Sequence, residues 1–277
     1  RQAAGQRDAF ALNMGGAYEK LGQPSEAARE YAVALTTRDR AQTASSAVTQ
    51  LYHLADDDTA RSAVTTVLEE TRQTGALPPE GLGVLLYART LRGDDPRRLL
   101  AELLPAPDGP NAAEQEFAPV LSRAAGRLAA REQPELALPF YERLLQSAAG
   151  DDVAAGMARR VADLQLRAGD WRGALALLQR TLEPARAGSL SPGQRAALAL
   201  MLGDVLLHYA RRPTDAVGAY ELTIKAVPES LSARLARWGQ ADALFALGDY
   251  DQALEEYERL LNLPTVQDEG EPFGPPG

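Results

Sequence analysis

The chain has 277 residues, 45% of them hydrophobic and 24% charged, which is enough to bury a sizeable core. Aromatic residues make up only 6% and β-branched runs are short, so we expect helices rather than strands. A net charge of −9 argues against binding to nucleic-acid phosphates, and the absence of cysteine excludes disulfides, zinc–thiolate sites and cysteine nucleophiles. No apolar run approaches the roughly 18 residues of a membrane span.

A pattern of glycine, alanine and tyrosine recurs along the chain. In "LGQPSEAAREYAVAL", Gly22 lies five residues before Ala27 and Tyr31 lies four residues after it. Whole or partial copies follow, with Arg98 replacing the alanine in a degenerate copy; the other marker alanines are Ala60, Ala137, Ala174, Ala216 and Ala253. The seven markers are separated by 33, 38, 39, 37, 42 and 37 residues. Because a helical-hairpin repeat has a period of about 34 residues, we assign the excess to Pro/Gly-rich connections.

The pattern predicts a string of helix pairs in chain order. The expected units are 8–37, 42–73, 79–104, 114–147, 152–184, 193–228 and 230–262, within a repeat array over 1–262, and an acidic Pro/Gly-rich tail or linker covers 263–277. In each unit the glycine ends the first helix in a left-handed conformation. A polar residue of the turn then caps the second helix, the candidates being Ser25, Asp58, Thr214 and Asp251. The small alanine lets the two helices approach closely, and the tyrosine fills the space beside the next unit.

These units resemble tetratricopeptide repeats (TPRs). The unit "MGGAYEKLGQPSEAAREYAVAL" places Met14, Gly15, Tyr18 and Gly22 where the family has large, small, aromatic and glycine residues. The resemblance covers roughly residues 8–262 and is weakest over 42–104. It implies an all-α, right-handed superhelical solenoid of about seven antiparallel helix pairs. We interpret the recurring residues as packing residues, because no unit can bury its apolar side alone.

The sequence offers no convincing catalytic or metal site. His53 and His208 are the only histidines, and neither has a second histidine at metal-ligand spacing. The acidic run 56–58 lacks the alternating pattern of a calcium loop and coincides with a predicted turn, which favours helix capping. We therefore expect no enzyme, no cofactor and no metal.

By resemblance, the first helix of each pair lines a concave groove that takes a peptide. First-helix residues that packing does not explain are the candidate partner-binding residues: Asn13, Lys20, Arg159, Asp163, Arg167, Asp204, His208, Trp238 and Asp242. Trp238 is either a binding anchor or a packing residue against the preceding unit, and the sequence leaves both open. The family's clamp for a chaperone's terminal carboxylate is not expected, because Leu12 and Gly16 occupy its lysine and asparagine positions.

The sequence predicts a non-catalytic scaffold for a protein or peptide partner, from a GC-rich bacterium. Two alternatives stay open: a regulatory module that senses a peptide or ligand, and an envelope module for secretion or polysaccharide export. Because the chain begins at Arg1, we expect it to belong to a longer protein, and the compartment (cytoplasm or periplasm) is undecided. Leu254 and Leu261 lie on the outer side of the last helix, where no further helix is predicted to bury them. They would be buried by continuation of the array, by end-to-end self-association, by a capping partner, or by a folded-back tail anchored by Phe273.

Overall fold

The computed structural model describes residues 2–36, 41–104, 112–131, 133–146, 148, 151–183 and 188–262, with the backbone alone at 2–9, 41, 112–116 and 151–152. Within these ranges the regular structure is helical and contains no strand, which confirms the predicted all-α class. The backbone packs into two compact units, residues 1–147 and 148–277, and each is described by itself. Residues 263–277, including Phe273, lie outside the described part of the chain.

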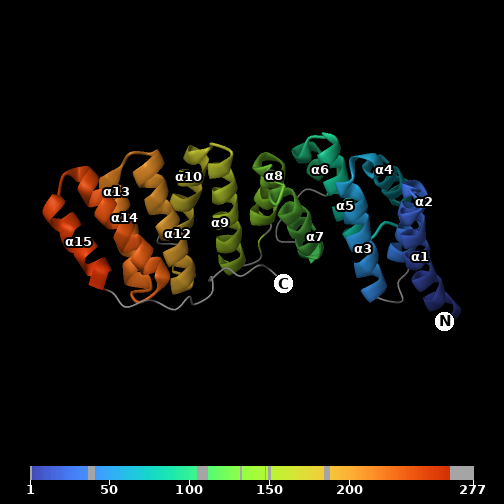
Figure 1. Ribbon diagram of the computed structural model, residues 1–277, viewed down its shortest axis with the longest axis horizontal. Coiled ribbons are helices and arrows are strands. Elements are labelled where there is room, and N and C mark those ends of the chain that lie inside the picture. The colour runs from blue at the N-terminus through green and yellow to red at the C-terminus, as the bar shows by residue number, and fades with distance from the viewer. Residues whose placement is uncertain are drawn as a thin grey trace. The chain divides into compact units, whose positions relative to one another are not determined.

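The N-terminal unit is built from consecutive helix pairs (Figure 1). Its helices are α1 (Gln2–Lys20), α2 (Pro24–Thr36), α3 (Ala41–Asp56), α4 (Asp58–Gln73), α5 (Pro79–Arg92), α6 (Pro96–Leu103), α7 (Ala112–Ala129) and α8 (Pro134–Gln146). Each odd-numbered helix packs on the even-numbered helix that follows it. The first helices also contact one another, α3 against α5 and α5 against α7. The three therefore form one continuous surface of the unit.

The C-terminal unit repeats the same plan. It contains α9 (Asp151–Arg167), α10 (Trp171–Thr181), α12 (Pro192–Asp204), the π-helical turn η1 (Val205–Tyr209), α13 (Pro213–Ala226), α14 (Leu231–Leu247) and α15 (Tyr250–Asn262). The extensive contacts run between neighbours in the chain, α12 with α13, α13 with α14 and α14 with α15. No described helix of either unit is long and apolar enough to cross a membrane.

The core follows the small-and-large pattern of the sequence. All six marker alanines are buried, whereas Arg98 in the degenerate unit is exposed. Tyr220 on α13 is fully buried between Gly203 on α12 and Gly239 on α14, and a Cβ at either glycine would overlap its ring. One tyrosine thus joins its own hairpin to the next one, as expected from the repeat.

Several turns between paired helices use left-handed backbone. Gly93 and Gly248 end α5 and α14 at φ values of 105° and 82°, which cost an L-residue with a Cβ about 1–2 kcal/mol. At the corresponding place before α13 the chain has Arg211, which adopts φ 56° without being glycine. This hairpin therefore carries a strained residue where the turns after α5 and α14 have glycine.

None of the four predicted capping residues is the N-cap, and Ser25, like the other three, lies inside the helix that it was expected to cap. Asp57 rather than Asp58 caps α4, accepting a hydrogen bond from a backbone N–H two residues later at 2.8 Å. Before α15 it is Asp249, not Asp251, that accepts a backbone N–H, at 3.4 Å. Thr214 lies inside α13, whose N-cap makes no side-chain hydrogen bond. Each error arises because the helix begins one or two residues earlier than the pattern suggested.

The π-helical turn explains an irregular spacing in the sequence. The Ala210 N–H donates to the Val205 carbonyl oxygen five residues earlier, at 2.9 Å. Tyr220 donates to Asp204 across 16 residues, whereas the equivalent Tyr257 donates to Asp242 across 15. A π turn accommodates one additional residue in a helix without ending it. The inserted residue therefore lies in η1, and the tyrosine–aspartate pair keeps its place.

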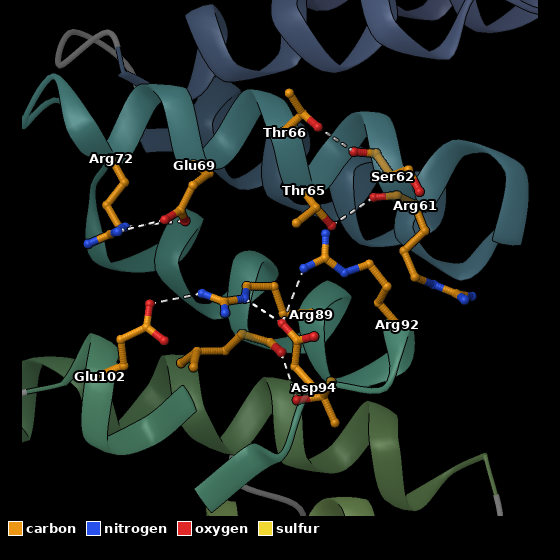
Figure 2. Close-up of polar contacts among 12 residues, drawn as sticks. Arg61, Ser62, Thr65, Thr66, Glu69, Arg72, Arg89, Arg92, Asp94 and Glu102 are labelled. Atoms are coloured by element: carbon orange, nitrogen blue, oxygen red, sulfur yellow. Dashed lines mark hydrogen bonds and ion pairs between the residues drawn. The ribbon is translucent and has the colours of Figure 1, made fainter. Parts of the chain in front are cut away.

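The degenerate unit is held by ion pairs in addition to its two buried leucines on α6. Figure 2 shows Arg89 on α5 between Asp94 of the turn and Glu102 on α6, at 2.7 and 3.0 Å. The hydrogen bond from Arg89 lowers the pKa of the Asp94 carboxyl, and Arg92 adds a second guanidinium at 3.3 Å. These contacts tie α6 to α5 where Arg98 has replaced the packing alanine.

Candidate functional site

An exposed apolar stripe runs along α14 in the C-terminal unit. Leu231, Leu235, Trp238 and Phe245 are 45%, 50%, 60% and 58% exposed. Steps of three, four and seven residues place them on one side of the helix. The Phe245 ring meets the Tyr250 ring edge-on, with centroids 5.2 Å apart. Trp238, for which the sequence left both a binding and a packing role open, thus lies in an apolar surface that the described residues leave open to solvent.

The predicted aspartates on this side have structural partners. Asp242, on α14, accepts a hydrogen bond from the Tyr257 hydroxyl at 2.5 Å, and this bond raises the pKa of Tyr257 to about 12. Asp204, on α12, accepts from the Tyr220 hydroxyl at 2.8 Å. Burial raises the pKa of the Asp204 carboxyl, against the opposing effects of the Tyr220 hydrogen bond and of nearby His208. Part of what the sequence assigned to partner binding is therefore explained by hairpin closure.

The other predicted residues are spread over α1, α9 and η1. Asn13 and Lys20 are exposed on α1. Asp163 and Arg167 form an ion pair of 3.0 Å within α9, one turn apart, and Arg159 lies half-buried on the same helix. His208 is exposed in η1. The structure brings His208 close to Asp204 and pairs Asp163 with Arg167, while Asn13 and Lys20 lie in the other unit.

Sequence reasoning missed a charged cluster on the first helices of the N-terminal unit. Arg127 on α7 and Arg131, two residues after its end, each reach the Asp56 carboxylate at the end of α3, with N–O distances of 3.0 Å. The Tyr87 hydroxyl on α5 donates to the same carboxylate. Burial, followed by this hydrogen bond, raises the pKa of Tyr87 to about 12. Asp56 therefore joins three consecutive hairpins through one carboxylate.

The signal for this cluster was present in the sequence. Arg123, Arg127 and Arg131 recur every fourth residue in "RAAGRLAAR", which places them along one face of a helix. The Arg127 guanidinium lies 4.8 Å from the centre of the Tyr52 ring, within cation–π range. Arg123 is exposed and forms no ion pair within the described residues.

A pocket of about 150 Å³ opens beside this cluster. It is lined by Val48 and Tyr52 of α3, Glu80 of α5, and Pro119, Val120 and Arg123 of α7. Tyr52 is 1% exposed, and its hydroxyl has no hydrogen-bond partner among the described residues. Burial raises the pKa of this phenol, so it stays protonated. The pocket thus combines apolar walls with the exposed guanidinium of Arg123, and the Tyr52 hydroxyl is covered from solvent.

The described residues contain no group of three or more histidine, cysteine or acidic side chains arranged to hold a metal ion. The first-helix faces carry an apolar stripe on α14 and a small pocket between α3, α5 and α7. Hairpins stacked on their neighbours in the chain define the class of helical-repeat proteins.

Comparison with known proteins gives a family match for the last hairpin. Residues 235–264 match the family model described as "Tetratricopeptide repeat", which confirms the predicted resemblance for this unit. The matched segment includes most of the α14–α15 hairpin and Trp238. Among solved structures, one described as the "TPR2AB-domain:pHSP90-complex of yeast Sti1" is 18% identical, with a TM-score of 0.34, over 92% of this chain and 90% of that one. No curated protein matches the chain.

Proposed function

We propose that this chain is a non-catalytic scaffold that binds a partner protein through a peptide segment, held on the first-helix face of α14. The observation that carries the proposal is the stripe of Leu231, Leu235, Trp238 and Phe245, four large apolar side chains left exposed on one helix of a TPR hairpin. Scattered exposed apolar residues are ordinary, but four in line on one helix indicate an interaction site. Asp242 lies on the same side of α14, where its carboxylate accepts the Tyr257 hydroxyl. The four exposed side chains are all apolar, so we expect the bound segment to present apolar side chains to them.

The energetics favour Trp238 as the centre of this contact. Apolar surface removed from water contributes about 25 cal/mol per Å², and tryptophan offers the largest such surface of any side chain. Interface residues whose truncation costs 2 kcal/mol or more are enriched in tryptophan and lie near the centre of the contact. Trp238 lies within the stripe, with Leu231 and Leu235 on one side and Phe245 on the other. We therefore assign it the largest share of the affinity.

The remaining predicted residues extend this proposal to other first helices. Asn13 and Lys20 on α1, and Arg159, Asp163 and Arg167 on α9, would contact polar parts of a partner. Asp204, His208 and Asp242 lie on the α12–η1 and α14 helices that carry the proposed site. A sensor module or an envelope-assembly module would use the same surfaces.

The test begins with selection of binding peptides from a random phage-displayed library on the immobilised full chain. The affinity of each selected peptide is then measured for wild type, Trp238→Ala, Leu235→Ala and the control Leu222→Ala. Leu222 is 47% exposed but lies on α13, a second helix, so the control removes a comparable apolar side chain elsewhere. We expect Trp238→Ala to weaken binding at least tenfold and Leu222→Ala to leave it unchanged. Equal affinities for the two variants would contradict the proposal, as would a selection without binders.

A further inference from the structure

We propose that copies of this chain associate end to end, with α1 of one copy packed against α15 of a second copy. The proposal concerns the first and last described helices and does not depend on peptide binding by α14. It begins with an apolar row on α1, where Phe10, Met14 and Leu21 are 63%, 43% and 69% exposed. Steps of four and seven residues place these side chains on one side of the helix. An ordered apolar row of this kind indicates a surface that is buried in an assembly.

A second apolar row lies on α15. Leu254 and Leu261, seven residues apart, are 57% and 85% exposed, and Tyr250, one turn before Leu254, is 61% exposed. Leu261 is the most exposed of the large apolar side chains in the described part of the chain. The described residues therefore leave one apolar row open to solvent on each of these two helices.

The interior of the fold shows what covers a row like that on α15. The first and last hairpins correspond at an offset of 226 residues, the separation of their marker alanines. Leu254 and Leu261 thus correspond to Ala28 and Leu35 of α2, which are 0% and 4% exposed. The helix α2 packs on α3, the first helix of the following hairpin. The α15 row is therefore the side of a second helix that elsewhere meets the first helix of a following hairpin.

The row on α1 is the other half of the same contact. Phe10 and Ala17 of α1 correspond to Ala236 and Ala243 of α14, which are 0% exposed. Gly239, between them, meets a tyrosine ring of the preceding helix α13. A second copy supplies to α1 the second helix that it lacks, and supplies to α15 the missing first helix, so the contact continues the packing already present between hairpins. Because Phe10 is larger than Ala236, α1 would lie farther from α15 than α14 lies from α13.

Charge predicts how this association responds to salt. Each copy carries a net charge of −9, so two copies repel each other at low ionic strength. The two rows are apolar, so added salt screens the repulsion and should strengthen the association. Association that weakens with salt would show that ion pairs hold the copies together, and would overturn the assignment to these rows.

The experiment is sedimentation equilibrium of the full chain from about 1 μM to about 1 mM. Because the contact joins two different faces, Phe10→Glu and Leu261→Glu each remove one face and leave the other intact. We expect wild type to reach the mass of a dimer or a larger assembly, each variant alone to stay monomeric, and their equimolar mixture to form dimers and nothing larger. The control Leu222→Glu, at a 47% exposed position of α13, should associate like wild type. A monomeric wild type, or dimers of either variant alone, would overturn the proposal.

Crosslinking locates the contact, because the chain has no cysteine of its own. Ala17→Cys and Leu254→Cys place one thiol in each row, and a short bifunctional maleimide should join the two variants to each other but neither variant to itself. Crosslinks between two copies of Leu254→Cys would show a symmetric contact and overturn the proposal. Phe273→Ala tests the tail as the alternative cover of α15. Association that appears only in this variant would show that the tail occupies the row, and would also overturn the proposal.

Discussion

Tyrosines of this chain differ in whether the hydroxyl has an acceptor. Tyr220 and Tyr257 each donate from the second helix of a hairpin to an aspartate on the first, Asp204 and Asp242. Tyr52 is as deeply buried as Tyr220, but its hydroxyl has no acceptor among the described residues. The first two hydroxyls close a hairpin, whereas the third adds no hydrogen bond to the described fold.

This difference predicts opposite effects of the same substitution. Tyr220→Phe should lower the free energy of unfolding by about 1.5–3 kcal/mol, because it removes a hydrogen bond to a carboxylate. Tyr52→Phe should leave it unchanged or raise it by up to about 1 kcal/mol, because it removes an unpaired buried hydroxyl. Urea unfolding of both variants checks this. A Tyr52→Phe variant as destabilised as Tyr220→Phe would mean that the Tyr52 hydroxyl has a partner within the fold.

The raised pKa of Asp204 predicts a pH dependence with a definite sign. Burial disfavours the ionised carboxylate, so its folded pKa exceeds its unfolded pKa, and stability gained from this group increases as pH falls through the folded pKa. Asp204→Asn keeps an acceptor for Tyr220 without the charge. The variant should therefore be more stable than wild type at neutral pH, with an advantage that shrinks as the solution is acidified.

The measurement is the thermal unfolding of wild type and Asp204→Asn, from neutral pH down through the folded pKa of Asp204. The charge of nearby His208 lowers the pKa of Asp204. Repeating the comparison in a His208→Gln background removes its contribution. An advantage that grows on acidification would show that the carboxylate is stabilised in the fold, opposite to the burial argument.

At the scale of the helix, hairpins join where a glycine of one helix meets a tyrosine of another. Gly239 of α14 faces the Tyr220 ring of α13 so closely that a Cβ would overlap it. Gly218, in the middle of α13, has open space on the side where a Cβ would point. The two glycines have the same chemistry and similar helical backbone, so their difference isolates the contact between hairpins.

Alanine at these two positions should therefore act in opposite directions. Gly239→Ala should destabilise the chain by about 1–3 kcal/mol, because it overpacks a buried contact. Gly218→Ala should stabilise it by up to about 1 kcal/mol, because alanine is the better residue within a helix. Chemical denaturation followed by circular dichroism measures both. If Gly239→Ala were stabilising, the Tyr220 ring could not occupy the place between α13 and α14 that the structure gives it.

At the scale of the whole molecule, the sequence predicts the features that recur in every hairpin and misses those that occur in only one. The helix class and its pairing follow from Gly248, Ala253 and the other residues at fixed offsets, because every hairpin must solve the same packing problem. The cap positions failed because helix ends depend on one or two residues of local geometry. The π turn of η1 was visible only as an extra residue, since spacing alone does not say where an insertion lies.

Some features of the candidate sites were predicted from the sequence and others were not. Trp238 was predicted as a groove residue, and the structure finds its side chain exposed in line with three other apolar residues. The pocket was not predicted, because it forms between helices that are distant in the sequence. Tyr52 and Arg123 both line it and are 71 residues apart, so no local sequence pattern indicates that they lie close together. A structural role for Asp242 was also missed, because its partner Tyr257 lies on the other helix of the hairpin.

The central claim, that a partner covers the α14 stripe, is tested most directly by the emission of Trp238. The chain has two tryptophans, so Trp171→Phe leaves Trp238 as the only indole. Saturation with a selected binding peptide should shift the emission to the blue and reduce quenching by iodide, because the 60% exposed indole becomes buried. Unchanged emission and quenching at saturation, with the peptide still bound, would contradict the claim.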